Sequence, residues 1–226
     1  MSRFSISRIR HLVKRPMSDH LDALSWYYHQ AEYFAFTRRH SLDFGGFVPR
    51  EELLTEFAES LTHSNNYRPY TNFHLKRLLR EALNTGISFE NFVDVGCGKG
   101  HPCIVGKKYF GFTNVYGIDF CEPLIEVAKQ NLAKMGYENV FFSVADATVW
   151  KLPEGNSLIL LNNPFNEVIM ERFLVSNLEH FRKYRSLIAY GNDFYRSTMY
   201  RLGFEIVFRS NRYGHSILQY SGSPTH

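Results

Sequence analysis

Two patterns of hydrophobic and polar positions divide the chain near residue 91. Before that point, apolar residues recur at the spacing of helices; after it, short apolar runs alternate with helical patterns. This alternation is typical of a mainly parallel sheet with helices on both faces. The short runs predict strands at residues 92–95, 115–119, 139–144, 157–161, 185–190, 204–209 and 215–221.

The segments between these strands define the rest of the second part. Residues 210–214 are short and rich in turn formers, so the last two strands should form an antiparallel hairpin at the sheet edge. We therefore expect an α/β fold with a seven-stranded, mostly parallel sheet. The intervening patterns predict helices at residues 101–110, 122–135, 166–181 and 193–201.

The first part of the chain predicts a helical extension. Pro49 is placed to start a helix through residues 51–57, and Thr71 to cap one that ends near residues 84–86. We expect residues 1–66 to form an N-terminal helical extension or cap and residues 67–226 to form the ligand-binding domain. Residues 18–39 predict an amphipathic helix packed on that domain, with apolar positions Leu21, Leu24, Trp26, Tyr27, Tyr28, Tyr33, Phe34 and Phe36.

Composition narrows the class of protein. Hydrophobic residues make up 44% of the chain and charged residues 21%, which suits a globular fold, and the formal net charge is +4. No apolar run has the length of a membrane-spanning helix, and no secretory signal is visible. Three cysteines (Cys97, Cys103 and Cys121) are too few for a disulfide framework. We expect a soluble, cytoplasmic protein.

The first sixteen residues carry a local excess of positive charge. Two interpretations stay open: a solvated arm, or a short basic helix that makes weak contact with a membrane surface, an acidic protein or RNA. In a eukaryote the segment would also resemble a transit peptide. The cations, which precede any acid, are Arg3, Arg8, Arg10, Lys14 and Arg15.

A glycine-rich loop follows the first predicted strand. Gly96, Gly98 and Gly100 let the backbone turn tightly and approach a ligand without Cβ atoms in the way. In open α/β sheets, ligands bind beyond the carboxyl ends of the strands, where this loop lies. The loop alone is compatible with a nicotinamide dinucleotide and with S-adenosylmethionine.

Three acids at the strand ends favour S-adenosylmethionine as the cofactor. Asp94 precedes the glycines, where a carboxylate can hold the cationic amino-acid and sulfonium end but would repel a pyrophosphate. Asp119 ends the second strand and suits the ribose hydroxyls, although a dinucleotide enzyme would also place an acid there. Asp146 suits the adenine amino group, beside the backbone NH of Ala147. The expected cofactor site further includes Cys97, Phe120 and Asn162.

The segment after the fourth strand indicates the acceptor. Asn162, Asn163, Pro164 and Phe165 resemble the loop with which amino-group methyltransferases hold a nitrogen nucleophile. An amide oxygen and a backbone carbonyl would orient the amine, while the aromatic ring covers it. The second position is Asn rather than Pro, so the loop is closer to that of the lysine methyltransferases that lack a SET domain. We expect these four residues to form the catalytic loop.

The run from Asp43 to the C-terminus resembles a group of bacterial class I methyltransferases with a Rossmann-like fold. The group shares an Asp-Phe/Tyr-Gly segment, a Tyr-x-Pro-Thr-like segment, the glycine loop with its lysine, and an Asn-Pro-Phe loop. The resemblance implies that Tyr67 and Thr71 form a lid over the methionine end of the cofactor. This chain differs in having His101 and Pro102 where the group has arginine, and Asp119 where glutamate is commoner.

The resulting hypothesis is methyl transfer to a nitrogen of a protein side chain or of a small-molecule amine. Two alternatives stay open: a non-catalytic module that binds S-adenosylmethionine or docks a partner, and a nicotinamide-dependent oxidoreductase. The spacings of a phosphate-binding P-loop, a zinc site and a hydrolase nucleophile elbow are missing from the sequence, so no metal is expected. The scattered Lys and Arg residues do not indicate a nucleic-acid partner.

Overall fold

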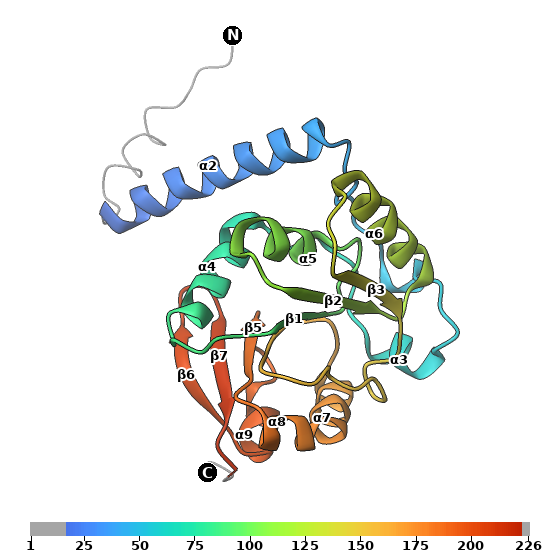
Figure 1. Cartoon of the computed structure of the whole chain (residues 1–226), viewed down its shortest axis with the longest axis vertical. Helices are drawn as coiled ribbons and strands as arrows, with labels where there is room; N and C mark the ends of the chain where they lie inside the picture. Colours follow the sequence, from blue (N-terminus) through green and yellow to red (C-terminus); the bar gives the residue numbers. More distant parts are fainter. Residues whose placement is uncertain (1–16, 223–226) are drawn as a thin grey trace, which may run out of the picture.

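The computed structural model describes residues 17–222, which are built around one seven-stranded sheet (Figure 1). The strand order is β3-β2-β1-β4-β5-β7-β6. The first five strands are parallel to one another, and β7 runs antiparallel to both of its neighbours, β5 and β6. The predicted fold class and terminal hairpin are confirmed. The strands are β1 Asn91–Val95, β2 Asn114–Asp119, β3 Val140–Val144, β4 Ser157–Asn162, β5 Leu187–Gly191, β6 Phe204–Ser210 and β7 His215–Tyr220.

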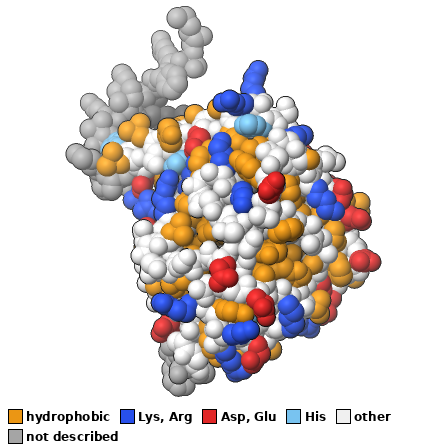
Figure 2. All heavy atoms as spheres, in the orientation of Figure 1, with side chains coloured by type: hydrophobic (Ala, Val, Ile, Leu, Met, Phe, Trp, Pro, Cys, Tyr) orange, Lys and Arg blue, Asp and Glu red, His pale blue; other side chains and the backbone are white. Residues whose placement is uncertain are grey.

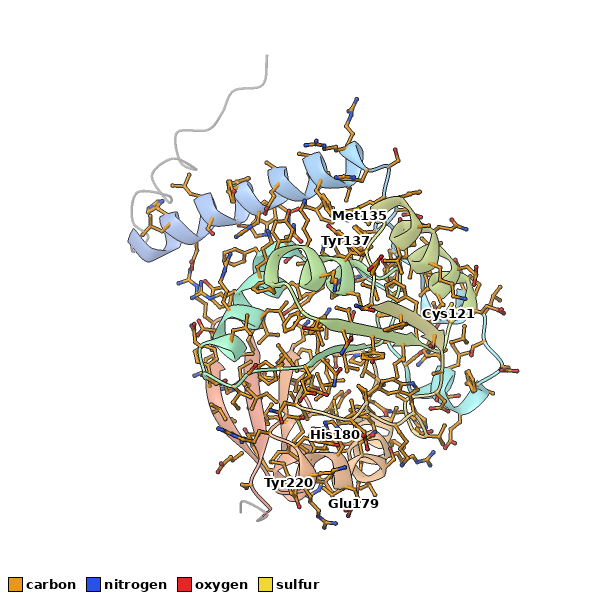
Figure 3. All side chains as sticks on the ribbon, viewed as in Figure 1. Cys121, Met135, Tyr137, Glu179, His180 and Tyr220 are labelled. Carbon is orange, nitrogen blue, oxygen red and sulfur yellow. The ribbon has the colours of Figure 1, made fainter. Side chains whose placement is uncertain are left out.

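Helices cover both faces of the sheet, which explains the unbroken apolar runs of its central strands. Successive residues point to opposite faces: Phe92 and Leu158 join one core, Val93 and Ile159 the other. Figure 3 shows His180 of α8 on the face opposite to α6, which carries Met135. The first face packs against α4 Asn72–Leu83, α5 His101–Val105 and α6 Glu122–Met135, and the second against α7 Glu167–Ser176, α8 Leu178–Lys183 and α9 Arg196–Arg201.

The predicted helix at residues 166–181 is wrong in its continuity, because it breaks at Asn177 into α7 and α8. The buried Asn177 amide accepts a hydrogen bond from Leu152 N (2.8 Å) and donates to Trp150 O (3.0 Å). The predicted helix at residues 193–201 also begins late, at Arg196. The predicted helix at residues 101–110 continues beyond α5 as the π-helix η2 Gly106–Phe110.

The prediction of a helix through residues 51–57 is wrong. A single 3-10 turn, η1 Arg50–Glu52, follows Pro49 and ends because Leu53 adopts extended backbone and packs on Leu124. The next helix is α3 Ala58–His63. Thr71 does occupy the N-cap position of α4, but its side chain makes no capping hydrogen bond.

The long helix α2 Met17–Arg39 is present and packs on α4 of the domain, but the prediction that its apolar positions form the packed face is wrong. Among its described side chains only His29 and Phe36 are buried, and most of its large apolar residues face outward. Apolar residues occur on every side of α2, and one helix can pack only one stripe against a neighbour. Figure 1 shows α2 lying across α4 and α5 at the outer margin of the fold.

Candidate active site

A cleft of about 930 Å³, including space open to solvent, lies beyond the carboxyl ends of β1, β2 and β4. This is the edge at which open α/β sheets bind ligands. The cleft is lined by Leu53, Ser60, Ser64, Asn65, Asn66, Tyr67, Arg68, Pro69, Tyr70, Asp94, Val95, Gly96, Cys97, His101, Pro102, Ile118, Asp119, Phe120, Leu124, Ala145, Ala147, Asn162, Asn163, Pro164, Phe165 and Ile169.

The glycine loop approaches its neighbours too closely for larger side chains. A Cβ on Gly96 would lie 2.4 Å from Cβ of Pro164, and one on Gly98 would lie 2.2 Å from the Tyr67 ring. Both glycines also have positive φ, +79° and +52°, which other residues rarely adopt. The loop therefore packs directly against the Asn-Pro-Phe loop on one side and the Tyr67 segment on the other.

Asp94 is a buried carboxyl group without a charged partner among residues 17–222. Its side chain is 2% exposed, and its one hydrogen-bond partner is the Cys103 thiol, with Sγ 3.9 Å from Oδ2. Burial raises the pKa of Asp94 well above its usual value, and the nearby Asp119 raises it further. A cationic ligand in the cleft would reverse this shift, because a nearby positive charge favours the ionised carboxylate.

Asp119 combines a structural and a potential binding role. Its Oδ2 accepts a hydrogen bond from Gly98 N and its Oδ1 from Cys121 N, each at 2.9 Å. Burial raises the pKa of Asp119 to about 6, although these amides oppose the shift. Each carboxylate oxygen has a further lone pair, so Asp119 can still accept hydroxyl groups from a ligand.

The Asn-Pro-Phe loop is held from the N-terminal side of the chain. Asn65 Nδ2 donates to Asn163 O (2.9 Å) and Asn65 N to Pro164 O (3.1 Å), and Ser64 forms a bridge with Phe165. Asn162 and Asn163 both line the cleft. Asn162 Oδ1 accepts one hydrogen bond, from Asn192 Nδ2 (3.0 Å), while Asn163 Oδ1 is buried without a partner.

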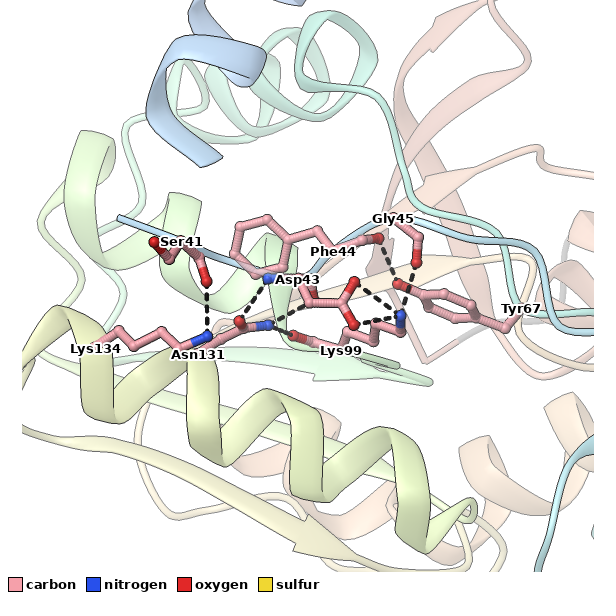
Figure 4. A network of polar contacts seen from close by, with 8 residues as sticks. All are labelled: Ser41, Asp43, Phe44, Gly45, Tyr67, Lys99, Asn131 and Lys134. Carbon is pink, nitrogen blue, oxygen red and sulfur yellow. Dashed lines mark hydrogen bonds and ion pairs between the residues drawn. The ribbon is translucent and has the colours of Figure 1, made fainter. Parts of the chain in front are cut away.

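A polar network connects the N-terminal extension to the glycine loop (Figure 4). Lys99 Nζ lies 2.9 Å from both carboxylate oxygens of Asp43 and donates to Gly45 O (2.8 Å). Asn131 of α6 binds the Asp43 backbone and Lys99 O, and Tyr67 OH donates to Phe44 O. The Asp-Phe-Gly segment and the lysine of the glycine loop therefore bind each other directly.

The structure brings eleven of the residues that the sequence predicts for the site together in the cleft. Thr71, Gly98, Gly100 and Asp146 lie outside the cleft lining. Gly98 and Gly100 pack against Tyr67 and Phe142, and Asp146 Oδ1 accepts from Thr148 N and Oγ1, both at 2.8 Å. The eleven are Tyr67, Asp94, Gly96, Cys97, Asp119, Phe120, Ala147, Asn162, Asn163, Pro164 and Phe165.

Sequence reasoning missed Tyr70, which lines the cleft. Tyr70 OH lies 3.0 Å from Nε2 of His215, which burial keeps neutral by lowering its pKa to about 4. A Cβ on Gly191 would lie 2.6 Å from Tyr70 OH and 3.0 Å from Asn162 Oδ1, so both oxygens border one point. Tyr70 and His215 are 145 positions apart, so no local sequence pattern signals this contact.

Residues 17–222 contain neither a metal-binding cluster nor a membrane-spanning helix. No group of three or more His, Cys, Asp or Glu side chains is arranged to hold a metal ion within that range. No helix of the described chain is long and apolar enough to cross a membrane.

Residues 88–183 match the family described as methyltransferase domain. A protein-L-isoaspartate O-methyltransferase of Dictyoglomus thermophilum is 26% identical over 103 residues, covering 46% of each chain. A ribosomal protein L11 methyltransferase of Thermotoga neapolitana is 31% identical over 87 residues, covering 37% of this chain and 30% of that protein. The chain therefore spans less than half the length of these curated relatives.

Solved structures share the fold at low sequence identity. An SAH-bound methyltransferase of Podospora anserina has a TM-score of 0.54 at 11% identity, over 67% of this chain and 80% of that one. TrmN of Thermus thermophilus has a TM-score of 0.50 at 18% identity, over 67% of this chain and 49% of that one.

The packing of the glycine loop generates a stability prediction. Gly98→Ala should lower the free energy of unfolding by about 2–4 kcal/mol, because it adds a clash with Tyr67 to the strain of a positive φ. Gly111→Ala is the matched control, with φ +67° but nothing within 4 Å of the new Cβ. It should cost about 1 kcal/mol.

Urea unfolding of the two variants measures this difference. Adding Tyr67→Ala to Gly98→Ala should recover part of the loss. Equal destabilisation by Gly98→Ala and Gly111→Ala would contradict the close approach of Tyr67.

Proposed function

We propose that this chain, which carries a class I methyltransferase domain of the Rossmann-like α/β type, transfers a methyl group from S-adenosylmethionine to a nitrogen of a protein side chain or small-molecule amine. The domain family implies use of S-adenosylmethionine. The observation that carries the proposal is the buried Asp94 carboxyl beside the Asn-Pro-Phe loop in one cleft.

The residues of the cleft fit this cofactor. Asp94 would face its cationic end, and Asp119 would accept the ribose hydroxyls, as the sequence suggests. Ala147 borders the cleft near Asp146, where the adenine ring is expected. When bound, the cofactor supplies an electrophilic methyl group on a positively charged sulfur. Dinucleotide binding is less well supported, since a pyrophosphate would meet the buried carboxyl of Asp94.

Neutral oxygen atoms support nitrogen as the acceptor. Asn162 and Tyr70 both line the cleft with their side-chain oxygens close to Gly191, and Asn163 Oδ1 is buried without a partner among the described residues. Acceptors of this kind bind N–H groups and orient the nitrogen lone pair, so positioning would supply most of the rate. The Asn163 and Pro164 carbonyls accept hydrogen bonds from Asn65, which holds the loop in place, and each keeps a second lone pair.

Exposed apolar side chains around the cleft favour a polypeptide over a small amine. Phe47 is exposed and lies under Arg68, with 4.9 Å between the guanidinium carbon and the ring centre. Leu54 adjoins Leu53 of the cleft lining, and Phe194 is 71% exposed two residues after Asn192. Aromatic residues are enriched at protein interfaces, so the Phe47 ring beside Arg68 of the cleft lining suits a polypeptide substrate. The names of both curated relatives refer to protein substrates of those enzymes.

Incubation of cell extract with purified chain and methyl-labelled S-adenosylmethionine tests the function. We expect label in protein, stable to mild alkali, because an N-methyl group survives treatment that cleaves a methyl ester. Asn162→Ala should lower the rate about 100-fold by misplacing the acceptor. Asn84→Ala, at the exposed end of α4, should leave the rate unchanged.

Other outcomes of this assay contradict the proposal. Alkali-labile label would indicate oxygen as the acceptor, as in the O-methyltransferase relative. Label in nucleic acid would exclude a protein or small-molecule substrate. Binding of the cofactor without any transfer would identify a non-catalytic module.

The raised pKa of Asp119 predicts a pH dependence of cofactor binding. The carboxylate must be ionised to accept two ribose hydroxyls, so affinity should fall as pH drops through about 6. Below that pH the loss should approach tenfold per pH unit. Isothermal titration with S-adenosylmethionine between about pH 5 and 8 measures it. Asp119→Asn should bind more weakly and lose the component centred near pH 6; an unchanged profile would exclude this role.

A further inference from the structure

Helix α2 is attached to the domain along one narrow face. Glu32 lies 2.7 Å from Lys76 and 3.1 Å from His29, and Lys76 Nζ lies 3.4 Å above the Tyr109 ring. Asp22 lies 3.1 Å from Arg212. Glu32 and Asp22 are therefore paired with cations of the domain. They do not balance positive charge on the side of α2 that faces away from the domain.

The opposite face of α2 is apolar and exposed. At 100° per residue, Leu21, Leu24 and Tyr28 fall within about 60° of one another, with Tyr27 and Phe34 on the adjoining side. All five are between 61% and 66% exposed. Figure 2 shows hydrophobic side chains at the surface along this helix. These five residues define the outer face. Glu32 projects at its edge, about 20° from Leu21, but is paired with Lys76, and Asp22 pairs with Arg212.

Positive charge lies at the C-terminal end of this outer face, and a basic stretch of sequence precedes its N-terminal end. Arg38 and Arg39 are exposed in the last turn of α2, and Lys108 lies beside it with Nζ 3.7 Å from the centre of the Phe36 ring. In the sequence, residues 1–16 precede the helix with five Lys and Arg residues and no acid. An apolar, aromatic helix face bordered by cations complements an anionic lipid surface, in which Leu and aromatic rings enter the interface.

We propose that the outer face of α2 docks the protein onto the surface of an anionic membrane. A second copy of the chain is a poorer occupant. Parallel pairing of two α2 faces brings Arg38 and Arg39 of both copies together, and antiparallel pairing sets these arginines against the end of α2 that the basic residues 1–16 precede in the sequence. The helix would lie in the interface without spanning the bilayer. The cleft keeps its own access to solvent, because it lies at the strand ends and α2 contributes no residue to its lining.

Vesicle flotation of the full chain tests this proposal. The protein should float with phosphatidylcholine vesicles that contain phosphatidylserine, and much less with phosphatidylcholine alone. The triple variant Leu21→Gln, Leu24→Gln, Tyr28→Gln should reduce partitioning about tenfold or more, because it removes three apolar side chains from the interface. Gln keeps the helix propensity, and the exposed sites should leave thermal unfolding unchanged.

Two further variants separate the contributions. Val149→Gln with Val175→Gln changes exposed apolar residues away from α2 and should float like the wild type. Arg38→Gln with Arg39→Gln should lower binding to anionic vesicles and weaken its salt dependence. Flotation unaffected by the triple variant, or equal on both vesicle types, would overturn the proposal. So would a dimer in sedimentation that the triple variant converts to monomer, since the face would then belong to a second copy.

Discussion

A carboxyl group buried at the end of β1, with one weak thiol contact, sets the chemistry of the cleft. Asp94 lies 2% exposed beside a second buried acid, Asp119, and both have raised pKa values. Burying two such groups is unfavourable unless a ligand provides positive charge or hydrogen-bond donors. A sulfonium cofactor with ribose hydroxyls would supply both, whereas the pyrophosphate of a dinucleotide would bring negative charge toward Asp94. The preference for this cofactor therefore rests on electrostatics, and the glycine loop adds the close backbone approach.

The same glycine loop links the parts of the molecule that surround the cleft. Gly96 packs on Pro164 of the Asn-Pro-Phe loop and Gly98 on Tyr67, while Lys99 binds Asp43. The segment that contains Tyr67 in turn binds the Asn-Pro-Phe loop through Asn65. Residues far apart in the chain thus form a closed ring around the cleft. A substitution at Gly96 or Gly98 should therefore displace both the Asn-Pro-Phe loop and the segment that contains Tyr67.

Much of the fold was predictable, because the period of apolar residues is a local signal. The strands end within about two residues of their predicted limits, and the parallel topology then brings Asp94, Asp119 and Asn162 to one edge. No local pattern of apolar residues signals the contact of Tyr70 with His215 or that of Asn65 with the Asn-Pro-Phe loop. The split at Asn177 depends on a side chain that binds a distant loop. For α2, periodicity identified the helix but could not show which of its apolar sides would be packed.

The direct test of the central claim is a calorimetric titration of wild type and Asp94→Asn with S-adenosylmethionine and with its neutral-sulfur product, S-adenosylhomocysteine. If Asp94 is the partner of the cationic end, the variant should lose about tenfold to hundredfold in affinity for S-adenosylmethionine. It should lose less for the product, which lacks the sulfonium charge. Glu126→Gln, on the exposed face of α6, should bind both like the wild type. Equal affinity of Asp94→Asn and wild type, or no binding by the wild type, would contradict the assignment.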